Sequence, residues 1–179
     1  MSIGDAEIKT QERVIRFFKD PRILGYQYIG NLSGYQNKNI KEDRLRQYLR
    51  LKGYADKLIE ATVMQLQQEA GNLSRGVYDA NKTVYSRLKY GIPVSESPEK
   101  PPVTVELIDE TNPLNNDFAI AEEVTVVEQQ EKRPDLVIYL NGIAVAVIEL
   151  KRSSISVSEG IRQNLTNQKD SFIRGFFTT

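Results

Sequence analysis

The stretch RPDLVIYLNGIAVAVIELKR, residues Arg133–Arg152, is apolar over most of its length and charged at both ends. Asn141-Gly142 separates two apolar runs, and this pair is a strong hairpin signal because both residues tolerate a positive φ. We therefore predict two paired antiparallel strands. The second run, Ile143–Ile148, is apolar at every position, so we expect a central strand that is covered on both faces.

Among the charged residues that flank this hairpin, three could form one site: Asp135 at one end, and Glu149 and Lys151 at the other. Burying an unpaired carboxylate costs several kcal/mol, so Glu149 is expected to have a partner or a metal ion. The alternative is a solvated strand end in which the acids and the lysine form a salt bridge.

The length of the turn decides whether the acids can act together. A two-residue turn at Asn141-Gly142 places Asp135 and Glu149 on opposite faces of the hairpin. A three-residue loop with a bulge at Gly142 places them on one face with Lys151. We predict the second arrangement, because two carboxylates beside an ammonium form a magnesium site suited to phosphodiester hydrolysis.

The rest of the chain predicts an α+β fold, a mixed sheet flanked by helices with a helical subdomain or insertion. Apolar spacing predicts helices at both ends of the chain and three or so in its middle, and β-branched runs predict the strands. In chain order we expect a helix over Asp5–Lys19, a strand over Leu24–Gly30, the helical subdomain over 38–91, a proline-rich loop over 92–102, three or four strands, and a helix over Ser156–Phe172.

The composition excludes several kinds of chemistry. The chain has no histidine and no cysteine, which rules out Ser-His-Asp catalysis, thiolate nucleophiles and the usual zinc sites. Lys plus Arg and Asp plus Glu both number 24, so an anionic partner must meet a local patch. The sequence lacks the apolar stretch of a signal peptide or a membrane helix, so we expect a soluble, cytoplasmic protein with no membrane partner.

The charged ends also match a known pattern. Pro134-Asp135 followed by Glu149-Leu150-Lys151 is the PD-(D/E)xK nuclease pattern. Together with the flanking NNDFAIAEEVTV and GIRQNLTNQK, the stretch resembles the N-terminal nuclease domain of the endonuclease (R) subunit of type I restriction enzymes. The resemblance covers most of the chain and is clearest over 115–169. It implies a restriction-endonuclease-like fold and a single nuclease domain over 1–179.

The resemblance further implies that this domain is the N-terminal piece of a longer subunit. The chain has no GxxxxGK[ST] phosphate loop, so ATP would be used by translocase domains that follow it. The implied partners are double-stranded DNA, these C-terminal translocase domains, and the methylation and specificity subunits of the restriction complex.

In this family, Asp135 and Glu149 would hold Mg²⁺ together with the backbone carbonyl of Leu150, and Lys151 would orient or activate the attacking water. Gln163 stands where the family has a catalytic glutamine. The tyrosine expected four residues later is Asn167 here. For both, contact with DNA and a solvated helix face remain open.

Glu12 is the candidate for a further acid from the first helix, and an ordinary exposed helix residue is its alternative reading. Two other functions also remain open: a catalytically inactive nuclease-fold module that binds DNA or docks a motor, and a partner-binding protein that works through residues 38–91.

Overall fold

The computed structural model describes residues 3–151 and 156–179, and it divides into two compact units. The sheet unit comprises residues 1–38, 118–139 and 145–174. The helical unit comprises residues 39–117, 140–144 and 175–179, and so includes the tip of the hairpin.

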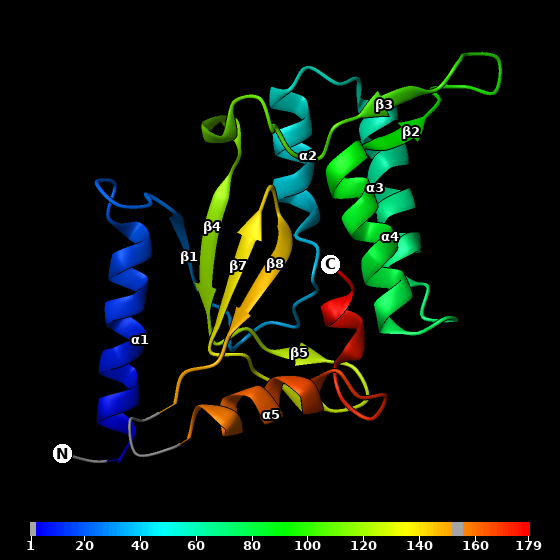
Figure 1. The fold of residues 1–179 in the computed structure, drawn as a ribbon. Coiled ribbons are helices and arrows are strands. Elements are labelled where there is room, and N and C mark those ends of the chain that lie inside the picture. Colours follow the sequence, from blue (N-terminus) through cyan, green and yellow to red (C-terminus); the bar gives the residue numbers. More distant parts are fainter. Residues whose placement is uncertain (1–2, 152–155) are drawn as a thin grey trace. The chain divides into compact units, whose positions relative to one another are not determined.

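The sheet unit is built on a four-stranded sheet with the strand order β1-β4-β7-β8, in which β1 runs parallel to β4 (Figure 1). A short antiparallel pair, β5 and β6, accompanies it. The elements are α1 (Ile3–Lys19), β1 (Gln27–Asn31), β4 (Phe118–Glu122), β5 (Val126–Val127), β6 (Glu131–Lys132), β7 (Leu136–Leu140), β8 (Ile143–Ile148) and α5 (Val157–Asn167). This mixed sheet with helices confirms the predicted fold class.

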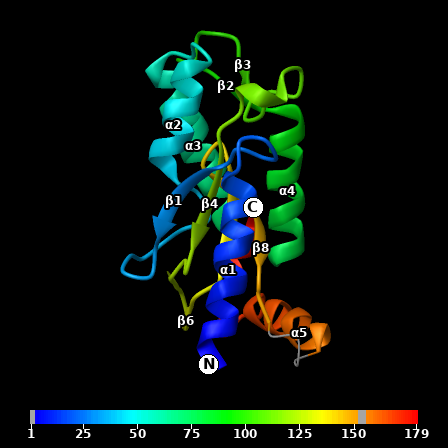
Figure 2. The ribbon, with the colours of Figure 1, turned by 90° about the vertical axis from the view of Figure 1, so that its left-hand side faces the viewer.

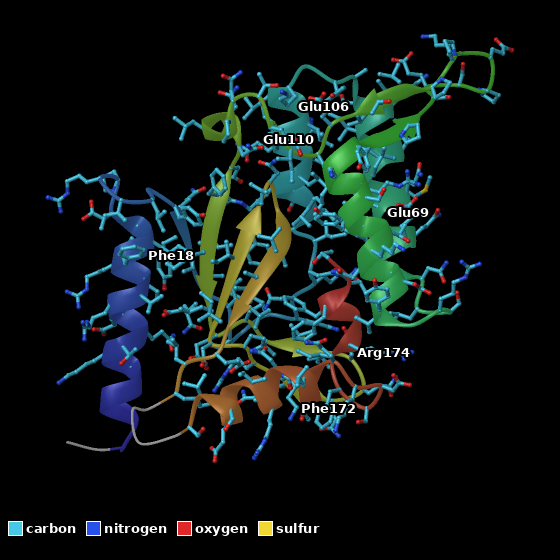
Figure 3. All side chains as sticks on the ribbon, viewed as in Figure 1. Phe18, Glu69, Glu106, Glu110, Phe172 and Arg174 are labelled. Atoms are coloured by element: carbon cyan, nitrogen blue, oxygen red, sulfur yellow. The ribbon has the colours of Figure 1, made fainter. Side chains whose placement is uncertain are left out.

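Helix α1 packs its apolar face against the sheet. Ile15 is buried with Ile120 and Leu136, and the ring of Phe18 meets that of Tyr26 edge-on at 5.2 Å. Figure 3 shows Phe18 on the side of α1 that faces β1, and Figure 2 shows the helix running alongside β1 and β4. The predicted amphipathic helix is confirmed, and these contacts hold it beside the sheet.

The hairpin between β7 and β8 has a two-residue turn, so the predicted three-residue loop is wrong. Asn141 and Gly142 both have positive φ, 51° and 83°. Positive φ at both residues defines a two-residue hairpin turn whose backbone twist matches the twist of the flanking strands. No extra residue is therefore needed at the turn.

The position of β8 also differs from the prediction. This strand stands at the end of the strand order rather than at its centre, and Val145 is 42% exposed. An unbroken apolar run shows only that the residues are nonpolar. It does not specify whether the strand has neighbours on one side or on both. Ala146 is also exposed, and its small side chain makes the run apolar without needing a covering layer.

The helical unit contains the three helices that the sequence predicts between residues 38 and 91. Helix α3 lies between α2 and α4 (Figure 2), and their shared core includes Leu45, Leu49, Ile59 and Leu66. The elements are α2 (Glu42–Leu51), α3 (Asp56–Gly71), α4 (Val77–Tyr90), β2 (Ile92–Val94), β3 (Val103–Val105), and two 3₁₀ helices, η1 (Pro113–Asn115) and η2 (Arg174–Thr178), of which η2 begins in the sheet unit.

The proline-rich segment forms the loop of a small hairpin. Strands β2 and β3 pair antiparallel, and residues 95–102 connect them. The expected loop over 92–102 therefore begins as a strand.

The turn residues of the long hairpin are packed tightly within the helical unit. A Cβ on Gly142 would lie 2.6 Å from the carbonyl oxygen of Lys41 and 2.8 Å from the backbone nitrogen of Leu45. The amide of Asn141 donates to the carbonyl oxygen of Leu107 at 2.8 Å, and its Oδ1 accepts from the backbone nitrogen of Asp117 at 2.7 Å. Glycine is thus required at 142 for space as well as for backbone conformation.

In the described residues, every helix is too short or too polar to span a bilayer.

Candidate active site

The candidate site lies within the sheet unit, where β7 begins and β8 ends. Asp135 immediately precedes β7, and its Oδ2 accepts a hydrogen bond of 2.6 Å from the backbone nitrogen of Leu150. Both residues stand just outside the strand bounds, where strict alternation of side chains no longer applies. This is how a two-residue turn still brings the two ends of the hairpin together.

Glu149 is the most perturbed acid of this site. Its pKa is raised to about 7, mainly by burial and then by the charge of nearby Asp135, while the ammonium of Lys151 opposes the shift. Its Oε2 accepts a hydrogen bond of 2.8 Å from Nε2 of Gln163. Its Oε1 is buried and has no hydrogen-bond partner among the described residues. A buried carboxylate oxygen without a partner is costly unless a cation or a proton compensates it.

These features fit a divalent cation. A cation between Asp135 and Glu149 would satisfy the orphan oxygen and offset the repulsion between the two acids. In the part of the chain that the structure describes, no group of three or more acidic, histidine or cysteine side chains is arranged so that all of them could hold one metal ion. The set available is therefore two carboxylates and backbone oxygen, which matches the one or two carboxylates that Mg²⁺ commonly takes from a protein.

Lys151 follows Glu149 by two residues and lies against α5. Its Cγ is 3.6 Å from the point where a Cβ on Gly160 would stand. The lysine stem therefore lies within van der Waals reach of α5, and the lysine charge acts on Glu149. The structure thus brings the predicted lysine to the predicted acids.

Gln163 contacts an acid of the candidate site, whereas Asn167 is buried at the end of the same helix. The hydrogen bond from Gln163 to Glu149 connects α5 with the end of β8, and Figure 1 shows α5 lying across that end of the sheet. Asn167 is buried at the end of α5, where its carbonyl oxygen accepts from the backbone nitrogen of Ile173 at 3.1 Å. Neither open reading of Asn167, a DNA contact or a solvated face, describes this buried position.

The structure does not bring Glu12 to the other acids. Its side chain is exposed, and it is the carbonyl oxygen of Glu12 that accepts a hydrogen bond from Nε of Arg16. The preceding residue faces the sheet instead. Nε2 of Gln11 donates to Glu122 at 3.0 Å and to Glu123 at 3.4 Å.

Glu122, the last residue of β4, and Glu123, which follows it, are acids beside the candidate site that the sequence reasoning missed. Oε1 of Glu122 accepts from the hydroxyl of Tyr28 at 2.7 Å. Glu123 lies near enough for its charge to raise the pKa of Glu149. A signal was available, because two consecutive acids end an apolar strand in FAIAEE.

Acids gather at the end of β4, just before β7 and just after β8, with a lysine and two glutamines around them, in an α+β fold of the nuclease-like class. The family model described as "Type I restriction enzyme R protein N terminus" matches residues 7–179. The chain belongs to this family.

One curated relative carries a functional name. The "Putative type I restriction enzyme MjaIXP endonuclease subunit" of Methanocaldococcus jannaschii is 29% identical over 122 residues. The matched segment covers 63% of this chain and 12% of the relative. The chain therefore spans only a small part of that protein's length.

Proposed function

We propose that this chain is the DNA-cleaving domain of a type I restriction enzyme and that it hydrolyses phosphodiester bonds with Mg²⁺. The family assignment supports a role in a restriction endonuclease subunit. The single observation that carries the chemistry is the buried, unpartnered Oε1 of Glu149 beside Asp135. Such an oxygen is suited to a cation and is poorly explained by a salt bridge in solvent.

In this proposal Asp135, Glu149 and the backbone carbonyl of Leu150 hold the ion. When bound, Mg²⁺ supplies positive charge for the phosphate oxygens and lowers the pKa of a coordinated water. The N–H of Leu150 keeps Asp135 in place, and Gln163 holds Glu149 through Oε2, which leaves Oε1 for the ion. Lys151 orients the attacking water and offsets charge that develops on the phosphate.

The partners follow from the same proposal. Double-stranded DNA would be delivered by ATP-dependent translocase domains of a longer subunit, within a complex that contains methylation and specificity subunits. The restriction complex would therefore supply sequence recognition, and the chain described here would supply the cut.

The experiment reconstitutes the restriction complex with wild-type or Asp135→Ala endonuclease subunit and measures plasmid cleavage and ATP hydrolysis. The expected result is that Asp135→Ala abolishes cleavage and leaves ATP hydrolysis intact. A Mn²⁺ titration of the 179-residue chain supplies a second readout, which Asp135→Ala should weaken. Normal cleavage by Asp135→Ala would instead support the inactive nuclease-fold module.

A further inference from the structure

Glu123 has an unusual backbone for its residue type. It follows the last residue of β4 with a φ of 51°, in the left-handed region. Among the described non-glycine residues, only Asn141 shares a positive φ. This conformation costs a glutamate more than it costs a glycine or an asparagine.

The left-handed residue changes where the Glu123 carboxylate points. Consecutive side chains on a strand project to opposite faces. Here the side chains of Glu122 and Glu123 both reach the single amide of Gln11. The turn at Glu123 therefore places its carboxylate on the same side as that of Glu122.

The Glu123 carboxylate holds an arginine beside the site. Its Oε2 lies 2.7 Å from Nε of Arg133, whose side chain is 55% exposed. No further partner of this guanidinium is recorded among residues 3–151 and 156–179. The pairing through Nε leaves the two terminal amino groups for another ligand.

Backbone hydrogen bonds tie this arginine to the candidate site. The N–H of Glu123 donates to the carbonyl oxygen of Asp135 at 2.9 Å, and the N–H of Val124 donates to that of Pro134 at 3.1 Å. Arg133 precedes Asp135 by only two residues. The guanidinium is thus fixed at the rim of the acidic site.

Stability alone does not account for this arrangement. An ion pair with a half-exposed arginine contributes little, and the backbone hydrogen bonds of residue 123 do not require its side chain. Glycine or asparagine would adopt the same backbone at lower cost. Backbone strain at a candidate functional site, here the positive φ of Glu123, indicates that the Glu123 side chain has a function.

The acids of the site create a need for such a cation. Four carboxylates, those of Glu122, Glu123, Asp135 and Glu149, gather where an anionic DNA strand would have to approach. A guanidinium presents a planar set of donors that fits a phosphate with two parallel hydrogen bonds.

We propose that Arg133 binds a phosphate of the DNA backbone beside the bond that is cut, and that Glu123 is the positioning residue that aims its guanidinium. This inference rests on the proposed function, because it assigns the contact to the same site.

The test measures binding of a short DNA duplex to the 179-residue chain by fluorescence anisotropy, at low salt and with Ca²⁺ to prevent cleavage. Arg133→Ala should weaken binding about tenfold. It should also reduce the slope of log K against log salt concentration by about one, which corresponds to one phosphate contact. Arg133→Lys should restore part of the affinity. Glu123→Gly should weaken binding to a lesser degree with an unchanged melting temperature, because glycine accepts the backbone conformation.

Arg50→Ala is the matched control. The Arg50 side chain is also 55% exposed, and its Nε pairs with Asp56 at 3.1 Å within the helical unit. Its replacement should leave duplex binding unchanged. If Arg133→Ala binds DNA no more weakly than Arg50→Ala, the proposal is overturned.

Two further measurements separate this proposal from the proposed function. Arg133→Ala should leave Mn²⁺ affinity unchanged, whereas Asp135→Ala should reduce it. If Arg133→Ala also loses Mn²⁺ affinity, Arg133 is a structural residue of the site and the proposed phosphate contact is overturned. If the wild-type complex fails to cleave and duplex binding still depends on Arg133, the cleavage function fails and the phosphate contact stands.

Discussion

The side-chain amide of Gln163 donates a hydrogen bond of 2.8 Å to Oε2 of Glu149, linking α5 to the end of β8. The other oxygen of the same carboxylate is buried and has no hydrogen-bond partner among the described residues. One amide thus fixes which oxygen of Glu149 remains for a cation. Groups that orient a metal ligand in this way commonly change metal affinity by one to two orders of magnitude.

Gln163→Leu should therefore keep the fold and weaken Mn²⁺ binding by about tenfold or more. The measurement is calorimetric titration of the 179-residue chain with Mn²⁺. The neighbouring exposed residue supplies the control, since Arg162→Ala leaves this hydrogen bond in place. Equal affinities in the two variants would show that Gln163 is not needed to orient Glu149.

The pKa of Glu149 predicts a pH dependence of stability. It is raised from 4.5 to about 7 in the folded chain, so the folded state holds this proton more tightly than the unfolded state. The stabilisation of the folded state by this proton is complete below pH 4.5 and is lost as the pH rises through about 7. After allowance for partial exposure of the group, the loss is on the order of 1 to 2 kcal/mol.

Urea unfolding in EDTA between pH 5 and 7.5 measures this effect. Wild type should lose stability relative to Glu149→Gln across that interval, and Mg²⁺ should restore wild-type stability at the upper end. Parallel curves for the two proteins would mean that Glu149 titrates normally.

The sequence predicted the parts of the site that depend on local chemistry. The Asn141-Gly142 turn follows from which residues tolerate positive φ, and it brings Asp135 and Glu149 to the same end of the hairpin whatever their exact register. The prediction of the register failed, because both acids lie just beyond the ends of the strands.

The remaining differences arise from tertiary packing. On a helix, Gln11 and Glu12 point about 100° apart, and only packing of α1 on the sheet decides which of them faces the acids. Nothing in FAIAEE specifies that Glu123 leaves the extended conformation, although this turn directs its carboxylate to Arg133. The place of β8 in the strand order likewise depends on the other strands.

Gly142→Ala tests the packing at the tip of the hairpin. The added Cβ would meet the carbonyl oxygen of Lys41 at 2.6 Å, and the backbone has a φ of 83°. We expect a loss of about 2 to 4 kcal/mol in the free energy of unfolding, because both the contact and the conformation are unfavourable. Gly34→Ala is the control, since a Cβ there has no neighbour within 4 Å. Similar unfolding midpoints for both variants would contradict the described turn.

The balance of charge predicts weak DNA binding by the chain alone. With a net charge of zero, few phosphate contacts are available, and affinity should stay in the range of non-specific binding, with a Kd of about 10⁻⁴ to 10⁻⁶ M at physiological salt. Anisotropy with several unrelated duplexes should give similar values. Nanomolar binding to one sequence would place DNA recognition within this chain.

Lys151→Ala separates catalysis from metal binding. Both carboxylates remain in this variant, and the lysine follows the end of β8 and is only partly buried, so the fold and Mn²⁺ affinity should persist. Cleavage by the assembled complex should fall by about 10² to 10⁴-fold if the ammonium orients the water or stabilises the developing charge. ATP hydrolysis should continue at the normal rate, since its site lies elsewhere in the proposed subunit. Cleavage at the wild-type rate, or loss of ATP hydrolysis together with cleavage, would reduce Lys151 to an ion-pair partner of the two acids.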